Sequence, residues 1–346
     1  MKDHKGMDMI FKTYILVLCV VSIFGVNTLQ ACSRFTYVGP AQTVITGRSM
    51  DWDEDLHSDL WAYPPGIKRT GDSASPNSLN WISKYGSIVA VAYNLGSADG
   101  MNSEGLDANL LYLSDADYGQ PMPDKKELSV FNWAQYVLDN YATVAEAVKG
   151  LSDPPFHMTT QILPNGAKPT LHLAITDPSG DNAVFEYVKG KLIIHHGHQY
   201  KVMTNEPTYD QQLALNDYWH RLNGSFLPGT TEPADRFIRA SYYLSVAPQT
   251  SDERQAIATV FSIIRNVSAP FSVSSNSRPN VAPTLWRSVA DLKHRIYYFE
   301  NTNRPNVFWV DFNKLNLKNG HTMKLPLAHQ EEYAGEVSSK FIAEKM

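Results

Sequence analysis

The chain has two cysteines, Cys19 and Cys32, and their positions limit the chemistry that a thiol could do. Cys19 lies inside an apolar run from Tyr14 to Val26, and three lysines precede that run. A positive start and an apolar run of roughly 7–15 residues, followed by a small residue, are typical of a secretory signal peptide. We therefore predict that residues 1–31 are a signal peptide and that the exported chain begins at Cys32.

A cysteine at the first position of a chain has a base attached to it. The α-amine has an ordinary pKa of about 7.7–8.0, so part of it is neutral near neutral pH and can take the proton of the thiol. The thiolate is the nucleophilic form, and a nearby cation favours it. Cys32 could thus supply both the nucleophile and the general base for attack on a carbonyl group.

Other interpretations of this N-terminal region compete with that one. Leu29-Gln30-Ala31-Cys32 also resembles a lipobox, in which the cysteine is lipidated and its amine is lost as a base. The protein would then be a membrane-tethered binding module without catalysis. A retained N-terminal anchor is a further alternative. No later stretch is long and apolar enough to span a bilayer.

Cys32 is followed by S-R-F-T-Y, and T-G-R-S-M-D-W at 46–52 contains Arg48 and Asp51. This pattern resembles the choloylglycine hydrolase family, which includes bile salt hydrolases and penicillin V acylases. The family places an arginine beside the thiol sixteen residues after the cysteine, and an aspartate near the α-amine three residues later. The resemblance implies these roles for Arg48 and Asp51. Their odd separation requires the strand to end or bend between them.

Two further motifs match the family's pattern. The sequence D-G-M-N-S-E-G-L at 99–106 resembles its G-M-N-x-x-G-L turn and strand, and the site residue ten positions after Asn102 is Tyr112. The sequence M-T-N-E-P-T-Y-D-Q-Q at 203–212 resembles the T-N-x-P-x-F/Y-x-x-Q segment. The asparagine of that segment serves the family's oxyanion hole, so the resemblance assigns this role to Asn205.

The last motif is L-P-G at 227–229 with D-R-F-I-R at 235–239, which resembles L-P-G…S-R-F-V-R. It implies that the second catalytic arginine is Arg236, with Arg239 as the substitute. Met50 and Trp52 are predicted to form an apolar wall of the substrate pocket.

Each assignment has a plainer alternative. Arg48 could be a surface arginine, Asp51 a turn residue, and Asn205 a cap of the turn before Pro207. A core role is the alternative for Met50, Trp52 and Tyr112, and a solvated helix position for Arg236. The remaining candidates are three histidines at the end of a predicted strand, which we interpret as an exposed turn and not as a metal site: His195, His196 and His198.

Blocks of predicted strands alternate with blocks of helices, which favours antiparallel sheets layered with helices over a parallel βαβ sheet. Strands are expected at 33–38, 43–50, 87–93, 105–113, 171–177, 182–188, 190–195, 201–204, 283–289, 293–299 and 306–311, with a turn at 96–103. Helices are expected over 130–141, 143–151, 209–222, 234–246 and 250–264, two of them with capping boxes at Thr143 and Thr250. We predict a single domain, 32–346, and the resemblance implies the α+β, four-layer αββα sandwich of N-terminal-nucleophile hydrolases.

Composition is that of a globular protein, with 43% hydrophobic and 19% charged residues, and the net charge of -5 gives no basic face for nucleic acid. The resemblance implies hydrolysis of a non-peptide C–N amide bond in a small molecule, without cofactor or metal, by an exported bacterial homo-oligomer, expected to be a tetramer. An aromatic pocket at Tyr112 and Trp52 favours penicillin V or an N-acyl homoserine lactone as substrate over conjugated bile salts.

Overall fold

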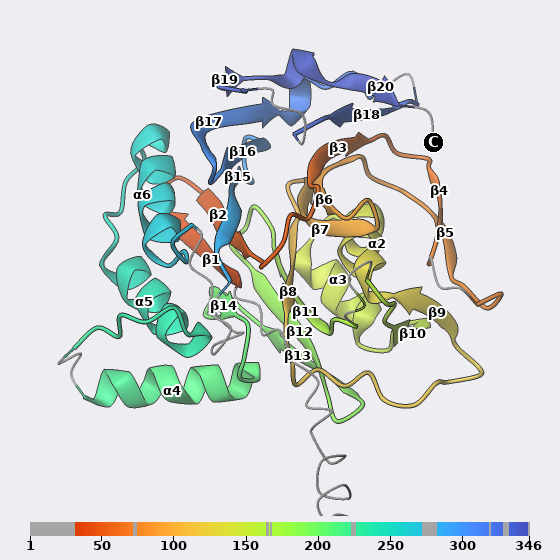
Figure 1. Ribbon diagram of the computed structural model, residues 1–346, viewed down its shortest axis with the longest axis horizontal. Helices are drawn as coiled ribbons and strands as arrows, with labels where there is room; N and C mark the ends of the chain where they lie inside the picture. The colour runs from red at the N-terminus through yellow and green to blue at the C-terminus, as the bar shows by residue number, and fades with distance from the viewer. Residues whose placement is uncertain are drawn as a thin grey trace, which may run out of the picture.

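The computed structural model describes residues 32–71, 75–163, 166, 168–222, 226–271, 282–317, 320–327 and 332–344. The predicted signal peptide, 1–31, lies outside these residues. Two sheets lie face to face in the middle of the described part, and helices cover the outer face of each (Figure 1). The predicted αββα sandwich is therefore confirmed.

The first sheet contains the strand that begins at Cys32. Within the described residues it has seven strands, and neighbours are antiparallel except for the last two. Their spatial order is β14 (Val202–Thr204), β1 (Cys32–Gly39), β2 (Thr43–Asp51), β15 (Thr284–Asp291), β16 (Ile296–Asn301), β17 (Arg304–Asp311) and β19 (Gly335–Glu336).

The second sheet is antiparallel and has nine strands in the described part of the chain. Their order is β13 (Lys191–His196), β12 (Asn182–Val188), β11 (Leu171–Thr176), β8 (Asp107–Tyr112), β7 (Gly96–Asn102), β6 (Ser87–Ala92), β3 (Asp59–Tyr63), β18 (Thr322–Leu325) and β20 (Ile342–Glu344). Two small pairs lie outside it: β4 (Lys68–Thr70) with β5 (Asn80–Ile82), and β9 (Lys126–Ser129) with β10 (Phe156–Thr159).

Each sheet has its own helices. The first sheet is covered by α4 (Tyr209–Arg221), α5 (Pro233–Val246) and α6 (Glu253–Asn266), and the second by α2 (Trp133–Asn140) and α3 (Val144–Leu151). Short 3-10 helices lie at Val130–Asn132, Phe312–Lys314 and Ser338–Lys340. None of the helices in the described ranges is long and apolar enough to cross a membrane.

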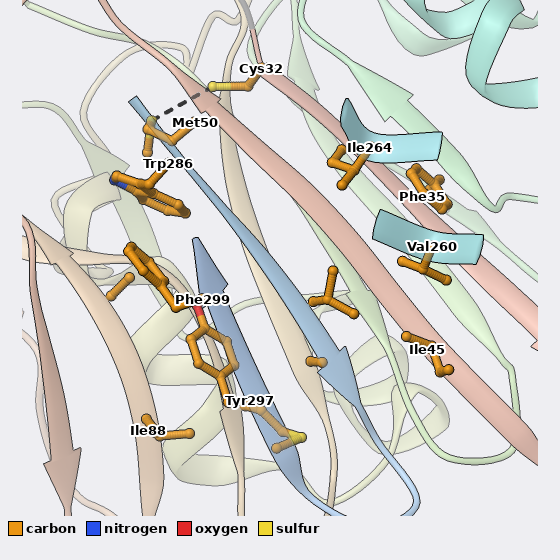
Figure 2. Close-up of a cluster of buried hydrophobic side chains, with 14 of the residues drawn as sticks. Cys32, Phe35, Ile45, Met50, Ile88, Val260, Ile264, Trp286, Tyr297 and Phe299 are labelled. Atoms are coloured by element: carbon orange, nitrogen blue, oxygen red, sulfur yellow. Dashed lines mark hydrogen bonds between the residues drawn. The ribbon is translucent and has the colours of Figure 1, made fainter. Parts of the chain in front are cut away.

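The alternation of side chains along β1 and β2 builds two cores from one sheet. Ile45 and Phe35 point toward α6 and meet Val260 and Ile264, whereas Met50 points to the other face, between the sheets (Figure 2). Residues two apart in a strand share a face. Arg48 therefore faces the space between the sheets, as Met50 does, and Asp51 faces the helices.

Most predicted elements are confirmed, and two predictions are wrong. The segment 96–103 is not a turn, because β7 occupies Gly96–Asn102. Its turn-like composition has a packing cause: a Cβ at Gly100 would lie 2.4 Å from the Ile88 carbonyl oxygen. The second error concerns the start of α6, whose N-cap is Asp252, accepting a hydrogen bond from Gln255 N, and not Thr250.

Candidate active site

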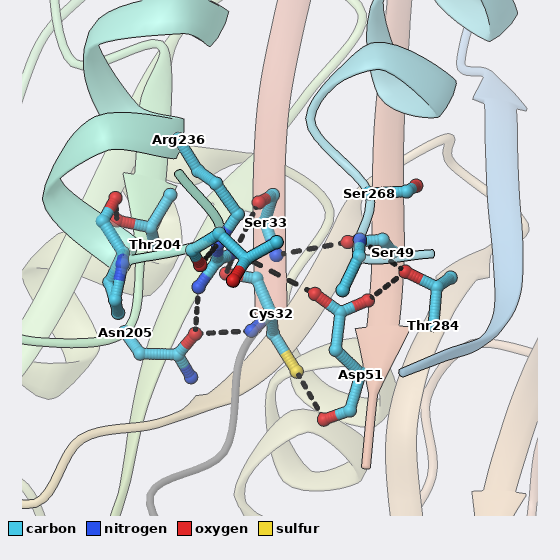
Figure 3. Close-up of polar contacts among 12 residues, drawn as sticks. Cys32, Ser33, Ser49, Asp51, Thr204, Asn205, Arg236, Ser268 and Thr284 are labelled. Carbon is cyan, nitrogen blue, oxygen red and sulfur yellow. Dashed lines mark hydrogen bonds and ion pairs between the residues drawn. The ribbon is translucent and has the colours of Figure 1, made fainter. Parts of the chain in front are cut away.

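Cys32 begins β1 and lies directly opposite Met50 of β2. The residue is 2% exposed, and its Sγ lies 3.8 Å from Met50 Sδ and 3.9 Å from the Asp51 carbonyl oxygen (Figure 3). Burial raises the pKa of the Cys32 thiol, while the positive charge of Arg48 acts in the opposite direction. The thiol is thus held at the end of a rigid two-strand ribbon.

Arg48 is buried on the same face of β2 as Met50. Its Nη2 donates to the Leu110 carbonyl oxygen at 2.7 Å, and its guanidinium lies 4.8 Å from the centre of the Trp286 ring. Its Nε lies 3.6 Å from the Asp99 carboxylate. Neither Nε nor Nη1 has a hydrogen-bond partner among the described residues. The free Nη1 of this buried cation is available to a group that enters beside Cys32.

Asp51 points to the opposite face of β2. Its Oδ1 accepts a hydrogen bond from Thr284 Oγ1 at 2.5 Å, and its Oδ2 lies 3.7 Å from Arg236 Nη1. Burial raises the pKa of Asp51 to about 6, although Arg236 opposes this shift. The expected break in β2 is absent, since the strand continues through Asp51. The irregularity is a register shift in β15, between Thr284 and Trp286.

Asn205 follows β14 and connects three parts of the site. Its Oδ1 accepts hydrogen bonds from Cys32 N and, at 3.0 Å, from Arg236 Nη2. Its Nδ2 donates one hydrogen to the Tyr112 carbonyl oxygen at 2.8 Å, which leaves the second hydrogen of that nitrogen for another acceptor. The nitrogen of Cys32 is therefore held by the amide of Asn205, and the role of Asp51 near the α-amine stays a prediction.

Arg236 reaches the site from α5 and is fully buried. Its Nη1 donates to the Cys32 carbonyl oxygen at 2.6 Å and to Ser33 Oγ at 2.5 Å. Arg239, the substitute candidate, donates instead to the carbonyl oxygens of Pro228 and Thr230. The structure thus brings Arg236 to Cys32, whereas Arg239, also on α5, binds the loop before that helix.

A pocket opens beside Cys32, and its empty space, together with the open solvent at its mouth, is about 540 Å³. Met50, Trp52 and Tyr112 line it together with Arg48, as the sequence predicted. Most of the remaining lining is apolar and comes from β6, β7 and the segment before β11. The indole nitrogen of Trp52 donates to Tyr93 Oη at 2.8 Å, so its polar edge is already paired. Such a pocket fits an apolar acyl group.

Sequence reasoning missed several partners of these residues. Thr284 lies in no motif, Ser33 lies in a quoted segment but was given no role, and Tyr93 lies at the tip of the β6–β7 hairpin. Asp99 is in a motif that we quoted, but nothing in the motif gave it a contact with Arg48. The three histidines do not converge: His195 pairs with Asp210, His196 with Asp181, and His198 with the Gly180 carbonyl oxygen.

The sandwich and the position of the cysteine at the start of an inner strand define the class, that of N-terminal-nucleophile hydrolases. Residues 32–326 match the model of the linear amide C–N hydrolases, choloylglycine hydrolase family. The chain belongs to this family, and the predicted reaction class, amide hydrolysis, is confirmed with it.

Three comparisons show which members of the family this chain is similar to. The chain is 43% identical to penicillin V acylase of Pectobacterium atrosepticum, over 95% of each chain. The solved structure of penicillin V acylase from Agrobacterium tumefaciens has a TM-score of 0.84 and 45% identity, and the match covers 91% of this chain and 98% of that one. A bile salt hydrolase/transferase of Clostridium perfringens is 26% identical, over 78% of this chain and 89% of its own.

Proposed function

We propose that this protein is an exported amidase of the penicillin V acylase type and that Cys32 is its nucleophile. The observation that supports it best is the position of Cys32 at an apolar pocket that Arg48 also lines, with the Cys32 backbone nitrogen bound to the amide of Asn205. The relatives of 43% and 45% identity are penicillin V acylases, which favours this activity over bile salt hydrolysis.

The proposed reaction begins when cleavage after Ala31 converts Cys32 N from a peptide nitrogen into an α-amine. The amine takes the proton of the thiol, and Sγ attacks the carbonyl carbon of the amide. The remaining N–H of Asn205 Nδ2 and the free Nη1 of Arg48 are the candidate donors to the oxyanion. One such donor is typically worth about 10²–10³ in rate.

The tetrahedral intermediate then breaks its C–N bond. The protonated α-amine gives its proton to the leaving nitrogen, and the acyl group stays on Sγ as a thioester. Water, deprotonated by the same amine, releases the acid and restores the thiol. Asn205 Oδ1 and the Arg236–Asp51 pair hold Cys32 in place, and the mechanism requires no metal or cofactor.

A substrate panel tests the activity. Steady-state kinetics of the mature protein should give the highest kcat/KM for penicillin V or a long-chain N-acyl homoserine lactone, because the pocket is apolar and aromatic. Glycocholate is the alternative, favoured by the bile salt hydrolase relative. A tenfold preference for glycocholate would reverse the ranking of substrates. No turnover of any of the three would contradict the proposed function.

Export is part of the proposal and has its own test. Intact mass spectrometry of the secreted or periplasmic protein should give residues 32–346 with a free amine. A diacylglycerol adduct on Cys32 would support the lipid-anchored alternative and remove the amine as a base. Light scattering of the same sample tests the tetramer that the family resemblance implies.

A further inference from the structure

Gln212 is the last residue of the motif at 203–212 but has no role in the mechanism above. It lies in the first turn of α4, seven residues after Asn205, and is 1% exposed. Its side chain turns back onto the segment that joins β14 to α4. That segment, 205–208, carries Asn205 and belongs to neither a strand nor a helix.

The amide of Gln212 binds this segment at several points. Its Nε2 donates to the carbonyl oxygens of Asn205 at 2.8 Å and Pro207 at 2.6 Å, with a longer contact of 3.3 Å to that of Thr204. Its Oε1 accepts from Thr204 N at 3.3 Å and from Thr204 Oγ1 at 3.1 Å. One buried side chain thus satisfies backbone groups that the sheet and the helix leave without partners.

The same contacts connect the two residues that hold Cys32. Thr204 Oγ1 also lies 2.9 Å from the Pro233 carbonyl oxygen, at the start of the helix that carries Arg236, so its single hydrogen is shared between this oxygen and Gln212 Oε1. Gln212 therefore fixes the backbone of Asn205 relative to both β14 and α5. A loss of these bonds would free the Asn205 backbone, and with it the amide that contacts Cys32 N and Arg236.

We propose that Gln212 is a positioning residue of the amidase reaction: it holds Asn205 at Cys32 and does not itself touch the substrate. The inference rests on the proposed function. A positioning role predicts that loss of Gln212 lowers kcat and leaves KM nearly unchanged. The acyl pocket is built by β6, β7 and the residues around Trp52, and Gln212 is not among the described residues that line it.

Two variants test the role. Gln212→Leu keeps the volume and removes all five contacts, and we expect kcat to fall about 10- to 100-fold, within the range of a lost oxyanion donor, with KM changed less than twofold. Gln212→Glu keeps the shape but places a carboxylate against carbonyl oxygens. When protonated it regains one donor, so the ratio of its kcat to that of the wild type should rise as the pH falls.

Asn102 is the matched control. It is fully buried at the far end of β7, where Nδ2 donates to the carbonyl oxygens of Leu138 and Tyr141 and Oδ1 accepts from Glu104 N and Leu106 N. Asn102→Leu should lower Tm but leave kcat within twofold of the wild type.

The results of these experiments distinguish a failure of the Gln212 role from a failure of the proposed amidase activity. If Gln212→Leu keeps the wild-type kcat, or if Asn102→Leu lowers kcat as much, Gln212 has only a structural role and the inference is overturned. The inference is also overturned if the ratio of the Gln212→Glu kcat to the wild-type kcat does not depend on pH. This second variant provides the test if Gln212→Leu does not fold. A wild type without turnover overturns the proposed function, and the inference with it.

Discussion

Two buried arginines lie near the start of β1 on different faces of the sheet. Arg48 reaches Met50 Sδ of β2 at 3.8 Å on the pocket face, and Arg236 holds the Cys32 carbonyl oxygen on the helix face. In the proposed mechanism the first can stabilise negative charge on sulfur or on the substrate, and the second fixes the backbone. The geometry thus gives the two cations different roles in that proposal.

Cys32→Ala should abolish amide hydrolysis and leave the fold intact. Among the described residues the Cys32 sulfur makes two long polar contacts, at 3.8 and 3.9 Å, so its removal costs about 1–2 kcal/mol. Turnover of penicillin V and the thermal midpoint of unfolding measure the two effects. Iodoacetamide should inactivate the wild type at the same time as it labels Cys32. Normal turnover by the alanine variant would refute the assignment of the nucleophile.

Glu206 makes the stability of the protein depend on pH. Burial raises its pKa to about 7 from an ordinary 4.5, and its Oε2 has no hydrogen-bond partner among the described residues. The folded state therefore holds a proton that the unfolded state has lost, so stability falls as the pH rises from about 4.5 through 7. The loss is on the order of 3 kcal/mol.

Glu206→Gln should remove the loss of stability that ionisation of the buried Glu206 carboxyl causes at higher pH. The variant should match the wild type in denaturant unfolding near pH 4.5 and exceed its stability at pH 8. Because Asp51 titrates with the same sign in the same range, the quantity to follow is the difference between variant and wild type. A difference that does not change with pH would show that Glu206 is ionised without cost.

At the scale of elements, the close contact between β2 and α6 depends on a glycine, Gly47, which has no side chain. A Cβ at Gly47 would lie 2.8 Å from Val260 Cγ1 and 3.1 Å from Phe35 Cζ. Gly47→Ala should therefore push the helix from the sheet and lower the free energy of unfolding by about 1–3 kcal/mol. Gly229→Ala is the control, because a Cβ there meets nothing within 4 Å. Equal midpoints in urea for the two variants would contradict the packing argument.

The sequence predicted the elements whose pattern is local. The periodic helices and most of the inner strands were found because burial of one or both faces leaves a repeat in the residues. The inner strand β7 was predicted as a turn, and β18 and the edge strand β20 were missed. They are short, and β18 joins the sheet through Leu325 opposite Leu60, a pairing between distant parts of the chain. Such a pairing leaves no signal in either segment alone.

In the candidate site, too, residues in a local pattern were predicted and contacts between distant parts of the chain were not. Cys32, Arg48 and Asp51 were found from their spacing in one hairpin, through the family resemblance. Thr284 was missed because it meets Asp51 only through the pairing of β15 with β2. The contact of Asn205 with Cys32 N was also unforeseen, since it depends on β14 lying beside β1.

At the scale of the whole molecule, a layer of buried polar groups joins the two sheets beneath the site. Arg34 of β1 donates through Nε to Asn109 Oδ1 at 3.0 Å and through Nη2 to Thr176 Oγ1, both on the second sheet. Asp99 of the second sheet accepts from Tyr297 Oη of the first and lies beside Arg48. Polar contacts of this kind fix the register of one sheet on the other, where apolar contacts alone would permit sliding.

The charges of this layer make Arg34 a sensitive position. Burial lowers the pKa of Arg34, and the carboxylate of Asp107 opposes that shift most strongly. Burial and Asp99 raise the pKa of Asp107, and Asp107 Oδ2 has no hydrogen-bond partner within the described residues. Arg34 is thus the main compensation for a carboxylate that is otherwise poorly satisfied.

Arg34→Met should lower the free energy of unfolding by about 1–3 kcal/mol, because it leaves the buried oxygens of Asn109 and Thr176 without this donor and removes a cation that favours the charged form of Asp107. Asp107→Asn added to it removes that charge, so the double variant should lose less stability than the sum of the two single variants. Urea unfolding of the wild type, both single variants and the double variant gives this coupling energy. The cost of Arg34→Met should also shrink at low pH, where Asp107 is protonated. Strict additivity at neutral pH would mean that Arg34 acts through its hydrogen bonds to Asn109 and Thr176 and not through its charge.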